Sequence, residues 1–153
     1  MILFVNGSPH RDGRTARMAA DLLAGLDYET LNLIDYRIEP LYSDHADGDR
    51  FEQVRARVVT ADVIVLGTPV YWHSLGALPR TLFERMYGAP SAGLAGRKLA
   101  FFTQGDQPRT EPGMGATTYT ITRFAVLYGL DLIGTAFGAG DLPALRKAID
   151  VAA

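Results

Sequence analysis

Short apolar runs alternate along the chain with segments in which hydrophobic residues recur every three or four positions. The runs at residues 2–5 and 63–66 are apolar throughout, which is typical of strands buried on both faces of a parallel sheet. From Thr15 onward, Ala19, Leu22 and Leu26 share one face of a helix. The pattern predicts five strands, each followed by a helix, with the strands at residues 2–5, 28–33, 63–66, 99–102 and 131–137.

The ends of the predicted helices are marked by local signals. Asp49 and Glu52 have the spacing of a capping box that opens the second helix. Pro79 is tolerable only in the first turn of the third helix. Two connections are expected to be loops, a short one at residues 68–74 and a long one, rich in glycine and proline, at residues 104–115. The fourth and fifth helices follow at residues 117–128 and 142–151.

Five strand–helix units predict an α/β fold, a three-layer α/β/α sandwich. Right-handed crossovers leave few topologies, and we expect a flavodoxin-like, five-stranded parallel sheet of order 2-1-3-4-5. The chain has 153 residues, the size of one domain, and we expect residues 1–153 to form a single unit. Ligands of such sheets bind beyond the carboxyl ends of the strands where the order reverses, here between the first and third strands.

Composition and charge narrow the function classes. The chain has no cysteine, which excludes disulfides, thiolate metal sites, iron–sulfur clusters and a cysteine nucleophile. Fifteen basic and 17 acidic residues give a net charge of −2, so we expect neither a nucleic acid nor a membrane surface as partner. No apolar run is long enough to span a bilayer, and the first residues do not resemble a signal peptide. We therefore expect a cytoplasmic protein.

The loop after the first predicted strand, residues 6–15, is rich in glycine, hydroxyl and basic side chains and leads directly into a helix. Backbone N–H groups at a helix start, together with hydroxyls and positive charges, are suited to bind a phosphate. The same residues could simply cap the helix, although Arg11 and Arg14 exceed what capping requires. A P-loop is excluded because five residues separate its glycines and Arg14 stands where a lysine is required. A receiver domain is excluded because Asn6 and Thr68 replace the acidic residues it needs.

Two further loops complete the candidate site. Residues 68–74 contain Tyr71 and Trp72, the only tryptophan, whose rings could cover a flat heterocycle or form a subunit interface. Residues 103–105 add backbone donors and polar tips around a glycine. A phosphate-binding end, an aromatic wall and a polar glycine turn together describe a site for flavin mononucleotide (FMN).

On these motifs the sequence resembles the NAD(P)H-dependent FMN reductase family. The first motif comprises Gly7–Ser8–Pro9–His10 and Gly13–Arg14–Thr15, and the second runs from Thr68 to Trp72 and into a helix that ends in Glu84–Arg85. His10 replaces an arginine of the family pattern and Arg14 replaces an asparagine, so the affinity for phosphate and its pH dependence differ from the pattern. The resemblance implies no metal and no catalytic side chain, and it implies cofactor binding by Ser8, His10, Arg14, Thr15, Pro69, Val70, Tyr71, Trp72, His73, Thr103, Gln104 and Gly105.

The activity implied is an FMN-dependent oxidoreductase. A hydride would pass from NADPH or NADH through flavin N5 to a small-molecule acceptor, which could be a quinone, nitro or azo compound or free flavin. A homodimer is implied as well. Two alternatives remain: a flavodoxin-type electron carrier without a nicotinamide substrate, and a non-catalytic flavodoxin-like binding protein.

Other polar clusters receive simpler interpretations. Asp44, His45, Asp47 and Asp49 could suggest a metal, but their spacing matches no calcium-binding loop, and a solvated loop that caps a helix is favoured. Asp106, Arg109 and Glu111 lie where a nicotinamide or an acceptor could reach. All of these residues are expected to lie in loops.

Overall fold

Five parallel strands form one sheet, in the order β2-β1-β3-β5-β6. The computed structural model describes residues 1–43, 47–87, 89, 93–105 and 112–153. A short sixth strand, β4, pairs antiparallel with the end of β3 and lies outside this order. The strands are β1 (Ile2–Asn6), β2 (Tyr28–Asn32), β3 (Val63–Tyr71), β4 (Ser74–Leu75), β5 (Lys98–Gln104) and β6 (Asp131–Phe137). With β4 set aside, the parallel order is the predicted 2-1-3-4-5.

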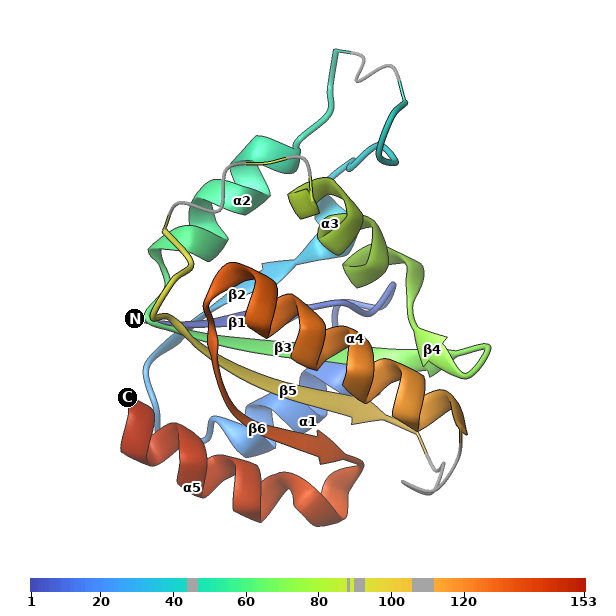
Figure 1. Ribbon diagram of the computed structural model, residues 1–153. Coiled ribbons are helices and arrows are strands. Elements are labelled where there is room, and N and C mark those ends of the chain that lie inside the picture. Colours follow the sequence, from blue (N-terminus) through green and yellow to red (C-terminus); the bar gives the residue numbers. More distant parts are fainter. Residues whose placement is uncertain (44–46, 88, 90–92, 106–111) are drawn as a thin grey trace.

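Helices cover both faces of the sheet, which gives the three layers expected (Figure 1). α1 and α5 lie on one face, and α2, α3 and α4 lie on the other. Two short 3-10 turns, Leu33–Asp35 and Ala139–Asp141, follow β2 and β6. The helices are α1 (Arg14–Leu22), α2 (Phe51–Thr60), α3 (Ala77–Tyr87), α4 (Pro112–Tyr128) and α5 (Leu142–Ala152).

The core divides between the two faces because side chains alternate along each strand. Phe4 and Phe102 stack beneath α1 and α5 with ring centroids 6.1 Å apart. Leu3 and Phe101 point to the opposite layer, where they pack with α2, α3 and α4. Gly67 lies under the Phe102 ring, and a Cβ there would lie 2.2 Å from Phe102 Cζ. This close approach requires glycine at the point where β3 meets β5.

Several element ends differ from the prediction. β3 continues to Tyr71 because it stays in register with β5 as far as the pair Pro69 and Gln104, so residues 68–74 are a strand end and hairpin rather than a loop. α4 begins at Pro112, which can occupy a helix start, instead of at residue 117. α1 ends at Leu22, and Leu26 packs against the core from outside the helix.

A second difference concerns the predicted capping box. α2 begins at Phe51 with Arg50 at the N-cap position. The Asp49 carboxylate accepts hydrogen bonds from the backbone N–H of Phe51 at 3.0 Å and of Glu39 at 2.8 Å. It also forms a two-pronged ion pair with Arg85 of α3, at 2.6 and 3.2 Å. Asp49 therefore joins α2 to α3 in addition to holding the start of its own helix.

The Asp49–Arg85 pair is largely buried, with side-chain exposures of 12% and 8%. Arg85 also donates to the Glu39 carbonyl at 2.9 Å and lies 4.5 Å above the Phe51 ring. Burial on its own raises the pKa of Asp49, but the hydrogen bonds from Arg85 and from two backbone N–H groups outweigh it. They hold the pKa of this carboxyl well below its usual range.

We expect Asp49→Asn to lower the free energy of unfolding at pH 7 by about 2–4 kcal/mol, because it leaves the Arg85 charge buried and unpaired. Because folding lowers the pKa of Asp49, the ionised carboxylate stabilises the fold above an unfolded-state pKa of about 4, and this contribution is lost as the pH falls. Urea unfolding from pH 7 to pH 3 should show that dependence in the parent and less of it in the variant.

Asp150→Asn is the matched control, because Asp150 pairs with Arg146 at the surface with 47% of its side chain exposed. Its loss should change the unfolding free energy by less than about 1 kcal/mol. Equal losses in the two variants would contradict the importance assigned to the buried pair.

Candidate functional site

The turn after β1 is shaped by the side chain of Asn6, the last residue of that strand. Asn6 is fully buried. Its Nδ2 donates to Asn32 Oδ1 at 2.9 Å and to the Arg11 carbonyl at 3.3 Å, and its Oδ1 accepts from the Ser8 backbone N–H at 3.1 Å. One amide thus joins the end of β2 to both ends of the turn.

The turn is fixed further by its own backbone. Gly7 N–H donates to the Gly67 carbonyl at 2.8 Å, which ties the turn to β3. Ser8 is buried, and its Oγ accepts from the His10 N–H at 3.1 Å. The turn's own hydrogen bonds therefore hold it in one shape, which lowers the cost of binding a ligand.

The start of α1 offers polar groups that the described chain does not satisfy. Gly13 is the N-cap and forms no side-chain cap, and a Cβ there would lie 3.0 Å from His10 Cβ. Thr15 is 1% exposed, and its Oγ1 has no hydrogen-bond partner among the described residues. A buried hydroxyl without a partner costs about 1–3 kcal/mol. Together with the positive end of the helix dipole, it fits an anionic, oxygen-rich group such as a phosphate.

The basic residues of the first motif lie at the surface of this turn. His10, Arg11 and Arg14 are exposed, and Arg11 pairs with Asp35 at 2.6 Å. Part of the positive charge predicted for the loop is thus compensated by the end of the 3-10 turn that follows β2. His10 and Arg14 are close to Ser8 and Thr15 along the chain, so the turn carries both basic side chains and hydroxyl groups.

The second motif folds into a tight hairpin, not a loop. Tyr71 pairs with Ser74 and Val70 pairs with Leu75, which leaves Trp72 and His73 as a two-residue turn. Their φ angles are +48° and +57°, as in the type I′ turns that normally contain Asn-Gly. A left-handed backbone costs a non-glycine residue about 1–2 kcal/mol. The hairpin is therefore strained at two consecutive positions.

The aromatic residues of the hairpin are exposed. Trp72 is 96% exposed and Tyr71 is 49% exposed, whereas Pro69 is buried and Val70 is half-buried. Within the single chain the Trp72 side chain is exposed at the hairpin tip, and the interpretation of Tyr71 and Trp72 as rings that cover a flat heterocycle or form a subunit interface stays a prediction. The residues at the hairpin base are the ones in contact with the sheet.

The third loop meets the second at the end of β5. Thr103 is paired with Thr68 across the strands, is fully buried, and has an Oγ1 without a partner in the described part of the chain. Gln104 and Gly105 are half-buried, and a Cβ on Gly105 would lie 4.0 Å from Val70 Cβ. All three predicted loops thus converge at the carboxyl edge of β1, β3 and β5.

Sequence reasoning missed Asn6 as a site residue, because it was considered only as a position that lacks an acid. A signal was present: asparagine ends both β1 and β2, and the register pairs Asn6 with Asn32. Asp106, Arg109 and Glu111, named for a nicotinamide or acceptor, lie outside the described residues, as do Asp44 and His45. Among the residues described, no group of three or more His, Cys, Asp or Glu could hold a metal ion.

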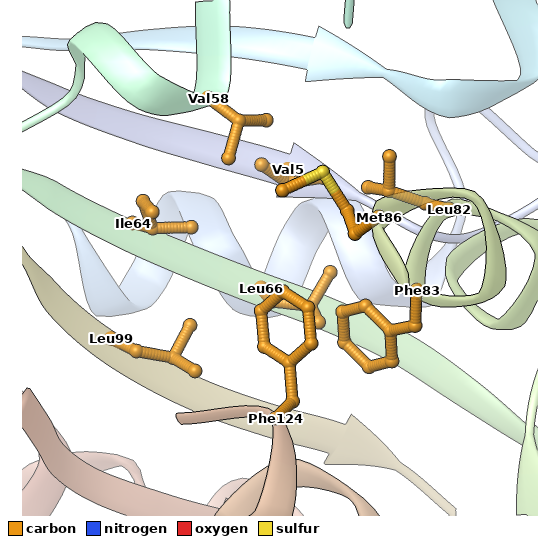
Figure 2. A pocket seen from close by; sticks show the side chains of 9 residues that line it. All are labelled: Val5, Val58, Ile64, Leu66, Leu82, Phe83, Met86, Leu99 and Phe124. Carbon is orange, nitrogen blue, oxygen red and sulfur yellow. The ribbon is translucent and has the colours of Figure 1, made fainter. Parts of the chain in front are cut away.

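A small cavity beneath α3 and α4 has an apolar lining, unlike the polar carboxyl edge of β1, β3 and β5. It has a volume of about 20 Å³, and Figure 2 shows its lining of aliphatic and aromatic side chains with one methionine, including Leu66, Phe83 and Phe124. Such a lining offers no hydrogen-bond partner to a phosphate or to the polar edge of a flavin, and we regard the cavity as a packing void of the core.

No helix in the described ranges is long and apolar enough to cross a membrane.

Comparison with known proteins agrees with this geometry. Residues 1–131 match the family model described as NADPH-dependent FMN reductase. YwqN of Bacillus subtilis (strain 168), whose name describes an NAD(P)H-dependent FMN-containing oxidoreductase, is 25% identical over 91 residues, which are 55% of this chain and 50% of that protein. The apo form of an NADH:FMN oxidoreductase, EMOB, superposes with a TM-score of 0.70 at 22% identity, over 98% of this chain and 86% of that one. A reduced Megasphaera elsdenii flavodoxin superposes with a TM-score of 0.62 at 20% identity, over 97% of each chain.

The chain belongs to the NADPH-dependent FMN reductase family, because the family model matches most of its length. This confirms the resemblance found in the motifs. The structural likenesses confirm the flavodoxin-like fold. The chain spans about half the length of YwqN.

We expect Thr15→Val to weaken FMN binding about tenfold, equivalent to about 1.4 kcal/mol, without lowering the stability of the apoprotein. The substitution removes a hydroxyl that no described residue satisfies, so folding loses nothing by it. Titration of the apoprotein with FMN, followed by flavin fluorescence, gives the affinity, and thermal unfolding gives the stability.

Thr117→Val is the matched control, because Thr117 also has a buried Oγ1 without a described partner but belongs to α4. It should leave FMN affinity within about twofold. An unchanged affinity in Thr15→Val would remove Thr15 from the phosphate site.

Proposed function

We propose that this chain is an FMN-dependent NAD(P)H oxidoreductase that reduces a small-molecule acceptor such as a quinone, a nitro or azo compound, or free flavin. The observation that carries the proposal is the convergence of the three loops at the edge where strand order reverses. There the preformed turn from Gly7 to Thr15 lies next to the base of the hairpin and the end of β5. Family membership supports the same cofactor.

The residues present suit the two ends of FMN. Ser8, His10, Arg14 and Thr15 supply the hydroxyls, positive charge and helix start that a phosphate requires. The backbone of Pro69, Val70, Tyr71, Trp72 and His73 would lie against one side of the flavin ring. Thr103, Gln104 and Gly105 would line the other side, where the unsatisfied Thr103 hydroxyl is available to a polar atom of the ring.

When bound, FMN supplies the redox chemistry, since it accepts a hydride from NADPH or NADH and passes electrons to the acceptor. The chain's own contribution is placement. The turn fixed by Asn6 orients the phosphate end, and the buried ends of β3 and β5 hold water away from the ring. The exposed side chains at the hairpin tip are available to a second molecule.

We further propose that the protein is cytoplasmic and acts as a homodimer, with a second copy covering α4. The helix carries one charged residue, Arg123, in 17 residues, and Tyr119, Val126 and Leu127 are each more than 60% exposed. A helix that is apolar on its outer face is usually covered. Tyr87 of α3, 74% exposed, extends the same surface, and the groove between α3 and α4 is lined with aromatic rings.

The function is tested by mixing FMN-loaded protein with NADPH under anaerobic conditions. Loss of the oxidised flavin absorbance within seconds, followed by its return when a quinone is added, is the expected result. A flavodoxin-type carrier would bind FMN but react only slowly with NADPH, and a binding protein without catalysis would show no turnover. Either result would overturn the proposal, as would failure to bind FMN at all.

The dimer is tested by Val126→Glu, which places a charge in the proposed interface. Light scattering at micromolar concentration should show a dimer for the parent and a monomer for this variant. Val151→Glu is the matched control: Val151 is 91% exposed on α5, on the opposite side of the sheet, and the variant should remain dimeric. A monomeric parent would contradict the proposal.

A further inference from the structure

The tip of the β3–β4 hairpin combines backbone strain with an unprotected aromatic ring. Trp72 and His73 both have positive φ angles, in a turn where glycine and asparagine are the residues that fit without strain. Burial does not explain the choice of tryptophan, because Trp72 is 96% exposed. The only tryptophan of the chain thus stands where its side chain makes almost no packing contacts and where the backbone conformation is unfavourable for a non-glycine residue. Backbone strain that is not offset by packing contacts indicates that the residue has a functional role.

The hairpin holds this ring at a fixed place. Its base is paired on both sides of the turn, Leu75 is buried, and the Thr68 hydroxyl donates to the Pro69 carbonyl at 3.0 Å. A Cβ on Gly76 would lie 3.4 Å from Thr68 Oγ1 and 3.7 Å from Tyr71 Cδ2, so the strand after the turn is packed closely against the strand before it. The backbone that carries the ring therefore loses little freedom when the ring binds a ligand.

The exposure of Trp72 distinguishes it from Pro69 and Thr103, two of the residues proposed to hold the cofactor. Pro69 and Thr103 are buried at the edge of the sheet, as expected for groups that hold a tightly bound ring. An indole in solvent is available to a molecule that arrives and leaves. The electron-rich face of indole stacks well on flat, electron-poor rings.

We infer that the Trp72 side chain is a docking platform for the second substrate, a planar and electron-poor ring such as a quinone, and determines preference for flat aromatic acceptors. The inference rests on the proposed function. It assigns the backbone of the hairpin to the cofactor and the indole of Trp72 to the acceptor. The nicotinamide ring of NAD(P)H shares the same chemistry, so the experiment separates the two half-reactions.

The principal variant is Trp72→Gly, which removes both the ring and the strain. We expect the thermal midpoint of unfolding to rise by about 2–4 °C and the KM for a planar quinone to rise at least tenfold. The KM for ferricyanide, which is not a planar ring, should rise far less than the KM for the quinone, because the loss is confined to planar acceptors. Trp72→Phe should keep most of the affinity for quinone, since a flat ring remains, but should not gain stability.

Tyr42→Gly is the matched control. Tyr42 is likewise an exposed aromatic residue with a positive φ angle, at 86% exposure and +65°, but it lies in the connection between β2 and α2. It should gain stability as Trp72→Gly does and leave every kinetic constant unchanged. The comparison separates relief of strain from loss of the ring.

Fluorescence provides a readout that does not depend on turnover. Trp72 is the only tryptophan, so quenching of indole emission by added quinone, measured on FMN-loaded protein without NADPH, reports contact at this one residue. Saturable quenching at the KM of the quinone is expected. Quenching that rises linearly without saturation, or an unchanged quinone KM in Trp72→Gly, would overturn the inference.

Two other outcomes also decide against it. Slower reduction by NADPH with an unchanged quinone KM would assign the ring to the nicotinamide, and a loss of FMN affinity in Trp72→Gly would assign it to the cofactor. Failure of the parent to bind FMN would instead overturn the proposed function, so the two failures are distinguishable.

Discussion

The geometry of the candidate site depends on one buried amide, the side chain of Asn6. It lies at the junction of β1, β2 and the phosphate-type turn, and its donors and acceptor are used by Asn32, Arg11 and Ser8. A polar side chain this deeply buried is tolerable only when its hydrogen bonds are made, and these bonds also determine the path of the turn. The same contacts that satisfy the amide therefore position Ser8 and the start of α1.

The edge of the sheet concentrates features that a structure selected only for stability would avoid. Thr15 and Thr103 keep hydroxyl groups that no described residue satisfies, and the hairpin tip holds two residues in a strained backbone. Away from the edge, polar groups such as Asp49 and Arg85 are fully engaged. Thr117 of α4 and Tyr42 each share one of these features, but the edge combines two unsatisfied hydroxyls with two consecutive strained residues, a combination typical of a binding site.

Prediction from sequence succeeded where one interaction dominates. The runs at residues 2–5 and 63–66 are strands because every position is buried between two helical layers, and the strand order follows from the number of strand–helix units. Prediction from sequence was wrong where contacts with another segment of the chain set the ends of an element. Residues 68–71 extend β3 only because β5 pairs with residues 68–69 and β4 pairs with residues 70–71. α4 begins at Pro112 although the apolar period is clearest from residue 117.

The sequence by itself determined the layers, the strand order and the two motifs that identify the family, because burial and chain connectivity act along the chain. The tertiary structure alone decided which of those motif residues are buried and which are exposed. Pro69 and Trp72 are three residues apart, yet one is enclosed between strands while the other projects from a turn. Exposure of this kind is set by strand pairing and by the position of the turn, both of which depend on residues distant in the chain.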